Sequence, residues 1–282
     1  MHDFIFTAAV HRLIDLALEE DIGSGDITTH CLIAPETLSE GAIIAKEPLV
    51  VAGLALAQNV FQRLDPEVDF RPNASDGDQV AAGDIVVNLK GSLGGMLTAE
   101  RTALNFLQRL SGIATNVSAY MKLIGDRQVR LVDTRKTTPG WRVLEKYAVR
   151  VGGAANHRMG LFDAVLIKDN HIAGGGGIKA AVERVRGRVS HLTKIEVETT
   201  SIDEVREALA AGADVIMLDN MDLAAISEAT RLINKRALVE ISGGVTREGL
   251  EALADSGVDL ISVGALTHSA RAVDLSMKIK EV

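Results

Sequence analysis

The chain has 282 residues, of which 47% are hydrophobic, 24% charged and 3% aromatic, with 26 glycines and a net charge of −8. This balance argues against intrinsic disorder, and the length suits one large α/β domain or two smaller ones. The longest apolar stretches, such as Leu49 to Ala57, stop at about ten residues, half of the roughly 20 that a membrane-spanning helix needs. A single cysteine, Cys31, excludes an internal disulfide and a thiolate zinc cluster, and the N-terminus has no secretory pattern. We therefore expect a soluble, cytoplasmic protein.

Positive charge is concentrated in the middle of the chain. From Arg101 to His171 there are 12 Lys and Arg against 5 Asp and Glu, within an otherwise acidic protein. Such a segment can bind nucleic acid, hold a small polyanion, or form ordinary solvated helix faces. Its aromatic residues do not alternate with the basic ones, and the acidity of the whole chain opposes binding to a phosphate backbone. The pattern therefore favours a small anionic ligand and no nucleic acid.

The N-terminal part, residues 1–113, is expected to form an α/β sandwich domain. An amphipathic helix is predicted over 8–20, ended by the turn at Gly23 to Asp26, and further strands and helices alternate after it. A long helix with an apolar stripe is predicted over 98–123. The elements between these helices are predicted as strands at 40–46, 49–52, 68–71 and 85–89 and a helix at 54–64.

Residues 114–265 are expected to form a β/α barrel. Short β-rich runs alternate there with helical runs, which indicates a parallel sheet. A polar, charged or glycine-rich group follows every strand, as expected when all strand ends meet at one barrel mouth rather than at one switch point of an open sheet. We predict an incomplete barrel of about six strands, followed by a C-terminal helix over 266–282 that packs on the N-terminal domain. The predicted strands are 130–134, 164–167, 194–197, 215–218, 237–241 and 260–263, and the helices are 140–151, 178–189, 201–211, 222–234 and 247–256.

Three kinds of chemical group follow the barrel strands. Cations in number suit planar carboxylates or pyrophosphate, and glycine-rich loops after the last strands suit a phosphate. A carboxylate pair without His or Cys at ligand spacing suits Mg²⁺, although it could instead form a structural ion-pair network. The cations are Arg135, Lys136 and Lys168, with His157 and Arg158; the carboxylates are Glu198 and Asp219; the small residues are Ser242, Gly243, Gly244, Gly264 and Ala265.

Several ordered motifs carry a resemblance that runs along nearly the whole chain. They are Leu18–Asp21, Glu100–Asn105, Asp133–Gly140, Glu145–Val149, Asn156–Leu161, Leu166–Ile172, Val197-Glu198, Ile216–Asn220 and Ser242–Gly244. Together they resemble the quinolinate phosphoribosyltransferase family, also called nicotinate-nucleotide pyrophosphorylase (decarboxylating).

The resemblance implies a transferase of NAD biosynthesis, specifically a pentosyltransferase among the glycosyltransferases. Quinolinate and phosphoribosyl pyrophosphate would give nicotinate mononucleotide, pyrophosphate and CO₂ with Mg²⁺, and the enzyme would be a homodimer. The family's quinolinate-binding residues correspond to Arg101, donated across the dimer, and to Arg135, Lys136, His157, Arg158 and Lys168. Glu198 and Asp219 match the acidic pair near the ribose and the metal, reached through water, and the small residues match the loops for the 5′-phosphate. Lys136, Lys168, Glu198 and Asp219 would carry the catalysis.

Three other functions compete with this interpretation. A pyrophosphorylase-like protein of molybdenum-transport operons resembles the same family but tends to lose the segment that is intact here as Lys168 to His171. A nicotinate phosphoribosyltransferase that does not decarboxylate would need fewer cations, because its substrate has one carboxylate. A non-catalytic phosphosugar-binding barrel is disfavoured because both Glu198 and Asp219 are retained.

Overall fold

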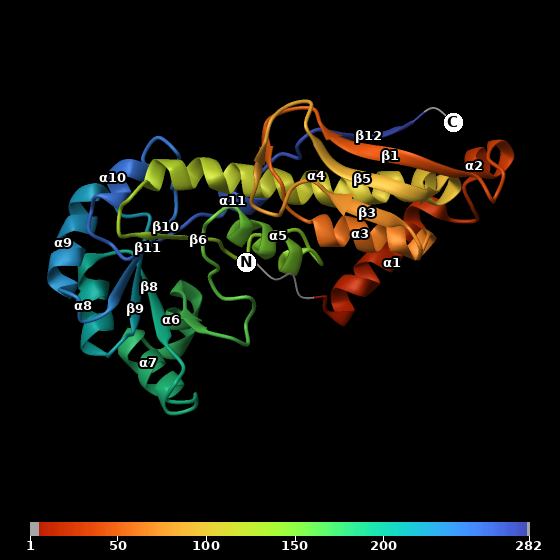
Figure 1. Ribbon diagram of the computed structural model, residues 1–282. Helices are drawn as coiled ribbons and strands as arrows, with labels where there is room; N and C mark the ends of the chain where they lie inside the picture. Colours follow the sequence, from red (N-terminus) through yellow and green to blue (C-terminus); the bar gives the residue numbers. More distant parts are fainter. Residues whose placement is uncertain (1–5, 281–282) are drawn as a thin grey trace. The chain divides into compact units, whose positions relative to one another are not determined.

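The computed structural model describes residues 6–280, which divide into two compact units (Figure 1). The first unit contains the described residues up to Ser118, then Thr137–Gly153, then those from Leu266 onward. The second contains Ala119–Lys136 and Ala154–Ala265. Neither unit is continuous in sequence, in contrast to the expected division at 113 and 265. No helix within residues 6–280 is long and apolar enough to cross a membrane.

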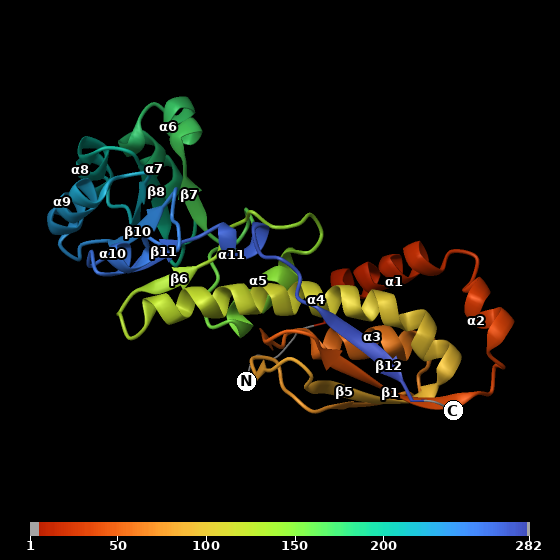
Figure 2. The same ribbon diagram turned by 90° about the horizontal axis from the view of Figure 1, so that it is seen from above.

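An antiparallel sheet with the strand order β12-β1-β5-β3 forms one layer of the first unit. Helix α4 runs along this sheet, with α3 beside it (Figure 2). The sheet strands are β1 (Leu38–Ala45), β3 (Asp69–Pro72), β5 (Ile85–Ser92) and β12 (Leu275–Ile279), and β2 (Leu49–Val50) pairs separately with β4 (Gln79–Val80). The helices are α1 (Ala8–Ile22), α2 (Ile27–Leu32), α3 (Leu54–Leu64) and α4 (Leu93–Ile124).

The segment Thr137–Gly153, expected in the barrel domain, instead packs with the first unit through helix α5 (Arg142–Val151). The fully buried Glu145 accepts a hydrogen bond at 2.9 Å from the guanidinium of Arg109, on α4. The ring of Trp141 stacks on that of Phe106 at a centroid distance of 4.8 Å. A buried carboxylate left without its partner is strongly destabilising, so the ion pair holds α5 against α4.

The predicted C-terminal helix over 266–282 is wrong. Within the described part of this segment, which ends at residue 280, only the short α11 (Ala265–His268) is helical, and β12 follows it as an edge strand that pairs antiparallel with β1. The sequence from Leu275 to Ile279 alternates apolar and polar residues, with Leu275 and Met277 buried and Lys278 exposed. This period of two matches a half-buried strand rather than a helix.

The second unit is a parallel sheet with the strand order β6-β11-β10-β9-β8-β7. Consecutive strands are neighbours from β7 to β11, and β11 then pairs with the first strand, β6, so only the β6–β7 pairing is missing. An open, doubly wound sheet would instead reverse its order at a switch point. The predicted incomplete barrel of six parallel strands is therefore confirmed. The strands are β6 (Arg130–Val132), β7 (Val165–Ile167), β8 (Ile195–Thr199), β9 (Val215–Asp219), β10 (Leu238–Ser242) and β11 (Leu260–Ser262).

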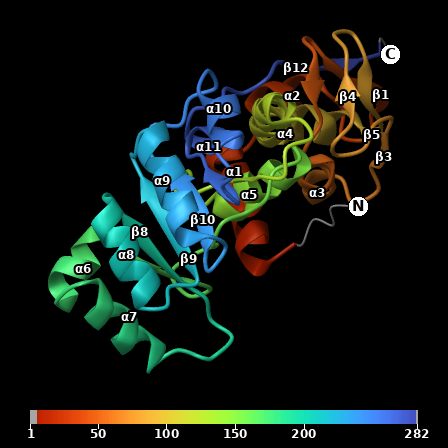
Figure 3. The same cartoon turned by 90° about the vertical axis from the view of Figure 1, so that its left-hand side faces the viewer.

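Helices cover the outer face of this sheet, as Figure 3 shows for α8 and α9. The helices of the unit are α6 (Asp169–Gly175), α7 (Ile178–Arg186), α8 (Ile202–Ala210), α9 (Leu223–Ile233) and α10 (Leu250–Ala254). The glycine-rich segment at 174–177 is helical up to Gly175. Gly176 then ends α6 in the left-handed conformation (φ 83°), which glycine adopts without a steric cost.

Candidate active site

The carboxyl ends of the barrel strands bring together most of the residues that the sequence singled out. Because the strands are parallel and ordered around a barrel, their carboxyl ends face one mouth. Arg135 and Lys136 follow β6, and Lys168 follows β7. Glu198 is the second-last residue of β8, Asp219 ends β9, and Ser242 ends β10 before Gly243 and Gly244. Gly264 and Ala265 follow β11.

His157 and Arg158 lie in the loop that precedes β7. Ala155 forms an isolated parallel bridge with Val132, so this loop runs beside β6 at the open edge of the barrel. The buried Asp133 holds the loop in place by accepting hydrogen bonds from the Asn156 side chain at 2.7 Å and from the backbone N–H of His157 at 2.9 Å.

Arg101 is the one predicted site residue that belongs to the first compact unit, where it is exposed on α4.

One ion pair and one side-chain hydrogen bond define the acidic part of the site. The ammonium group of Lys168 lies 2.5 Å from Oε2 of the half-buried Glu198. Oδ2 of Asp219 accepts a hydrogen bond at 2.9 Å from the side-chain amide of Asn220. Within the described part of the chain, the second oxygen of each carboxylate makes no side-chain hydrogen bond. These oxygens, from adjacent strands β8 and β9, are donors that suit Mg²⁺.

The loop after β10 approaches the same acidic group closely. Gly243 (φ 81°) and Gly244 (φ 60°) are left-handed, and Asn220 is left-handed as well (φ 55°). A Cβ atom on Gly243 would lie 2.3 Å from Oδ1 of Asn220. The backbone N–H of Asn220 donates to the carbonyl oxygen of Ser242 at 3.0 Å. The expected phosphate loop and the expected metal carboxylate are therefore packed against each other.

Arg158 at this mouth is partly buried and lies near a second cation, Arg135. Burial, together with the nearby charge of Arg135, lowers the pKa of Arg158 from its usual value. Arg158 is anchored by a 3.2 Å hydrogen bond from Nη1 to the carbonyl oxygen of Ala164, whereas Arg135 and Lys136 are exposed. Guanidinium groups held this close together gain most from an anionic ligand that lies between them.

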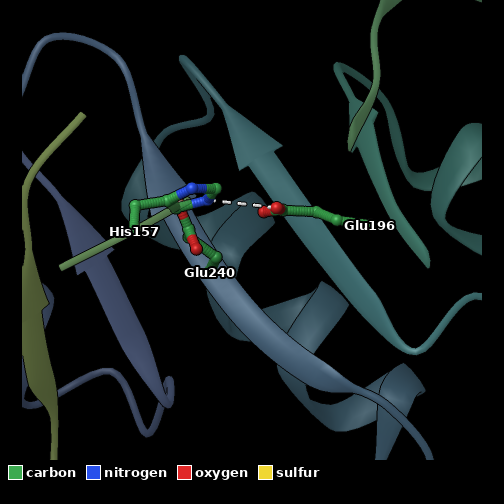
Figure 4. Close-up of side chains that lie close together, drawn as sticks. All are labelled: His157, Glu196 and Glu240. Carbon is green, nitrogen blue, oxygen red and sulfur yellow. Dashed lines mark hydrogen bonds and ion pairs between the residues drawn. The ribbon is translucent and has the colours of Figure 1, made fainter. Parts of the chain in front are cut away.

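A polar cluster that the sequence analysis did not identify lies inside the barrel (Figure 4). Nε2 of His157 lies 3.1 Å from Oε2 of Glu196 and 3.6 Å from Oε1 of Glu240, and both carboxylates are buried. Burial and the neighbouring charge of Glu196 raise the pKa of Glu240 to about 7. The signal for these residues was a charge in the middle of two otherwise apolar strands, Ile195 to Val197 and Leu238 to Ile241.

The comparisons with known proteins point to one family. Residues 113–278 match the family model described as "Quinolinate phosphoribosyl transferase, C-terminal domain", and residues 26–111 match its N-terminal counterpart. A probable nicotinate-nucleotide pyrophosphorylase of Synechocystis is 47% identical over 93% of this chain and 90% of its own length. A probable nicotinate-nucleotide pyrophosphorylase of Bacillus subtilis is 42% identical over 95% of this chain and 92% of its own length. The crystal structure of NadC from Streptococcus pyogenes superposes with a TM-score of 0.95 at 42% identity, covering 99% of each chain.

Proposed function

The chain belongs to the quinolinate phosphoribosyltransferase family, and we propose from this membership that it makes nicotinate mononucleotide. It transfers the phosphoribosyl group of phosphoribosyl pyrophosphate to quinolinate with loss of pyrophosphate and CO₂, a step of NAD biosynthesis. The observation that carries the proposal is the convergence, at one barrel mouth, of close guanidinium groups, two carboxylates and left-handed glycines. A dicarboxylate would bind the guanidinium groups, a ribose would lie at the two carboxylates, and a phosphate would bind at the glycines.

The cations account for the choice of acceptor. Quinolinate is a pyridine with two adjacent carboxylates, and Arg135, Arg158 and Lys168 can bind both while leaving the ring nitrogen directed at the sugar. Glu198, the carboxylate that the proposal assigns to the ribose, forms an ion pair with Lys168, which supports a role for Lys168 at the same site. The proposal assigns Lys136, at the same strand end, to the same cluster.

Charge development explains both halves of the reaction. Departure of pyrophosphate leaves positive charge on the ribose, which the carboxylates of Glu198 and Asp219 stabilise. The new N-glycosidic bond makes the pyridine nitrogen cationic. This cation accepts the electron pair that the departing carboxylate leaves on the neighbouring carbon, and a proton then replaces CO₂. Positioning and charge are sufficient for this chemistry.

Magnesium is part of the proposal, and the residues present fit it. Glu198 and Asp219 each retain a carboxylate oxygen beyond those used by Lys168 and Asn220, and no His or Cys competes at ligand spacing among the described neighbours of the pair. These two residues would hold Mg²⁺ through water, and the bound ion would neutralise the pyrophosphate. Ser242 to Gly244 and Gly264 to Ala265 would hold the 5′-phosphate by backbone N–H groups.

A homodimer that shares its sites is also part of the proposal. Arg101 is exposed on α4, one turn after Thr98, whose hydroxyl donates to Asp26 at the start of α2. Helix α2 presents Ile27 and Leu32, which are 77% and 75% exposed. Exposed apolar side chains on α2, which contacts α4 through Asp26 and Thr98, support a surface where a second copy docks and receives Arg101 in its site.

Mixing two inactive variants tests the shared site. If Arg101 acts in the partner's site, Arg101→Ala and Lys168→Ala chains reassembled in equal amounts should regain about one quarter of the activity, because half of the dimers contain one intact site. The measurement is product formation after unfolding and refolding the mixture, with each variant refolded alone as the control. No recovery, despite dimers by light scattering, would place Arg101 in its own chain's site or outside the mechanism.

Arg135→Ala should weaken quinolinate binding and spare phosphoribosyl pyrophosphate. Loss of a charged hydrogen-bonding group costs about 1.5–3 kcal/mol, which corresponds to roughly a 10- to 150-fold increase in the quinolinate Kd. Calorimetric titration of each substrate gives the two constants, and Arg184→Ala, an exposed arginine on α7, is the matched control. Normal affinity for both substrates would remove Arg135 from the site.

Release of labelled CO₂ tests the function as a whole. With quinolinate labelled in the carboxylate that departs, ¹⁴CO₂ should form only when both substrates and Mg²⁺ are present, with nicotinate as the parallel acceptor. Pyrophosphate formed with nicotinate but not with quinolinate would keep the barrel and its phosphate site while changing the acceptor.

A cytoplasmic location completes the proposal, and the free, exposed thiol of Cys31 suits a reducing compartment.

A further inference from the structure

We propose that Glu196 and Glu240 are positioning residues of this enzyme, which fix the His157 ring inside the barrel and thereby hold Arg158 at the quinolinate site. The inference rests on the proposed function for its substrate, but the contacts that support it are independent of that function. Glu196 and Glu240 come from β8 and β10, which flank β9, and both side chains point toward the same imidazole (Figure 4). Side chains from alternate strands share a layer in a barrel interior, where aliphatic residues are usual.

The two ring nitrogens of His157 have different partners. Nδ1 accepts a hydrogen bond at 2.8 Å from the backbone N–H of Arg158, so the ring proton lies on Nε2. Nε2–H then donates to Oε2 of Glu196 at 3.1 Å. The imidazole thus links the barrel interior to the backbone of the very residue that is expected to bind a substrate carboxylate.

The position of His157 in the fold gives this link its importance. The loop that carries His157 and Arg158 lies at the one place where the barrel lacks a strand pairing, and Val132↔Ala155 is its isolated bridge to β6. Asp133 fixes the backbone of the loop from one side. The ring contact with Glu196 fixes it from inside the barrel, so both contacts replace the hydrogen bonds that a neighbouring strand would supply.

The same cluster has the composition of a metal site, but its hydrogen bonds oppose one. The nearest ligand atoms of His157, Glu196 and Glu240 all lie within 4.8 Å of one another, and Oε1 of each carboxylate is buried without a hydrogen bond. A metal ion on Nε2 would require the ring proton on Nδ1, where the Arg158 N–H already donates. The geometry therefore favours a polar triad that positions a loop, in which Glu196 is hydrogen-bonded to the ring and Glu240 lies 3.6 Å from it.

Substitutions that keep or remove the hydrogen-bond acceptor test the proposal. Glu196→Gln retains a side-chain oxygen and should keep the wild-type KM for quinolinate within about threefold, whereas Glu196→Leu should raise it by about 10- to 100-fold, as expected for a misplaced binding group. The KM for phosphoribosyl pyrophosphate should stay unchanged in both, which separates the effect from any disturbance of Glu198. Glu240→Leu should also raise the quinolinate KM, but less, because its oxygen is farther from the ring.

Stability and coupling distinguish positioning from a merely structural role. Removing one partner of a buried hydrogen bond leaves the other unsatisfied, so Glu196→Leu should lower Tm, whereas the double variant Glu196→Leu/His157→Leu, which removes both partners, should recover most of that loss. A double-mutant cycle combines Glu196→Leu with His157→Leu. The double variant should raise the quinolinate KM no further than the more severe single variant does, because both substitutions break the same contact. Additive effects, or unchanged KM values in Glu196→Leu, would overturn the proposal.

Two measurements test whether the contacts of His157 with Glu196 and Glu240 exist, without relying on catalysis. The ¹⁵N spectrum of His157 in the full chain should report a neutral Nε2–H tautomer that is lost or exchange-broadened in Glu196→Leu. A cationic ring, or a stoichiometric metal ion by elemental analysis that disappears in Glu196→Leu, would overturn it. If the wild type forms no product from quinolinate, the proposed function fails, while these two results still decide whether the triad exists.

Discussion

Asp219→Asn should lower kcat by about 10²- to 10³-fold while leaving the quinolinate Kd nearly unchanged, as for the loss of one preorganised charge at a transition state. Asp219 ends β9 at the barrel mouth, and the Asn220 amide orients its carboxylate by donating to Oδ2 at 2.9 Å. The substituted side chain has the same size but no charge to stabilise the ribose cation or to hold Mg²⁺. Steady-state kinetics and quinolinate titration on the same preparation check both parts of the expectation.

Asp222→Asn is the matched control for this change. Asp222 lies three residues further along the same loop and accepts a hydrogen bond from the backbone N–H of Ala225 at 2.8 Å, as the N-cap of α9. Asparagine caps a helix about as well as aspartate, so this variant should keep wild-type kinetics and stability. A kcat for Asp219→Asn equal to that of the control would remove Asp219 from the mechanism.

Gly243→Ala should raise the KM for phosphoribosyl pyrophosphate and lower kcat, with kcat/KM falling by about 100-fold, as for a displaced catalytic group. The added Cβ would lie 2.3 Å from Oδ1 of Asn220, so the Asn220 side chain must move. That movement breaks its hydrogen bond to Asp219 and shifts the adjacent loop that is expected to bind the 5′-phosphate. One methyl group would thus disturb two parts of the site.

Gly212→Ala separates this steric effect from backbone strain. Gly212 has nearly the same φ (79°, against 81° for Gly243), but a Cβ there meets nothing within 4 Å. Both variants should lose about 1 kcal/mol of stability, because alanine disfavours a left-handed backbone, but only Gly243→Ala should lose activity. Thermal unfolding and kinetics of the pair provide the comparison, and equal activities would show that the loop tolerates the contact.

The strand-end residues show why so much of the site could be predicted from the sequence. In a parallel barrel the carboxyl ends of all strands lie at one mouth. Because Lys168, Glu198 and Asp219 each lie at such a strand end, the six predicted strands were enough to predict that these residues lie at the same mouth. The six barrel strands were predicted in the correct order for the same reason, since apolar runs and their turn residues recur locally. The family motifs then suggested a role for each residue.

Features that depend on distant partners could not be predicted in this way. Residues 266–282 were predicted as a helix, whereas Leu275–Ile279 is a strand because β1 offers it a free sheet edge. The segment Thr137–Gly153 belongs with the first unit because buried Glu145 pairs with Arg109, 36 residues earlier. A prediction from sequence rests on the pattern of neighbouring residues, which contains neither β1, the partner of Leu275–Ile279, nor Arg109, the partner of Glu145.

The sequence by itself determined the fold class, the six-strand parallel barrel, the family and the residues available at the barrel mouth, because periodicity and motifs are local properties of the chain. Tertiary structure alone decided which of those residues touch. It paired Lys168 with Glu198, packed Asn220 against Gly243, and brought Glu196 and Glu240 from separate strands to one imidazole. Such contacts depend on strand register and on the direction of each side chain, which are fixed only when the sheet closes around its interior.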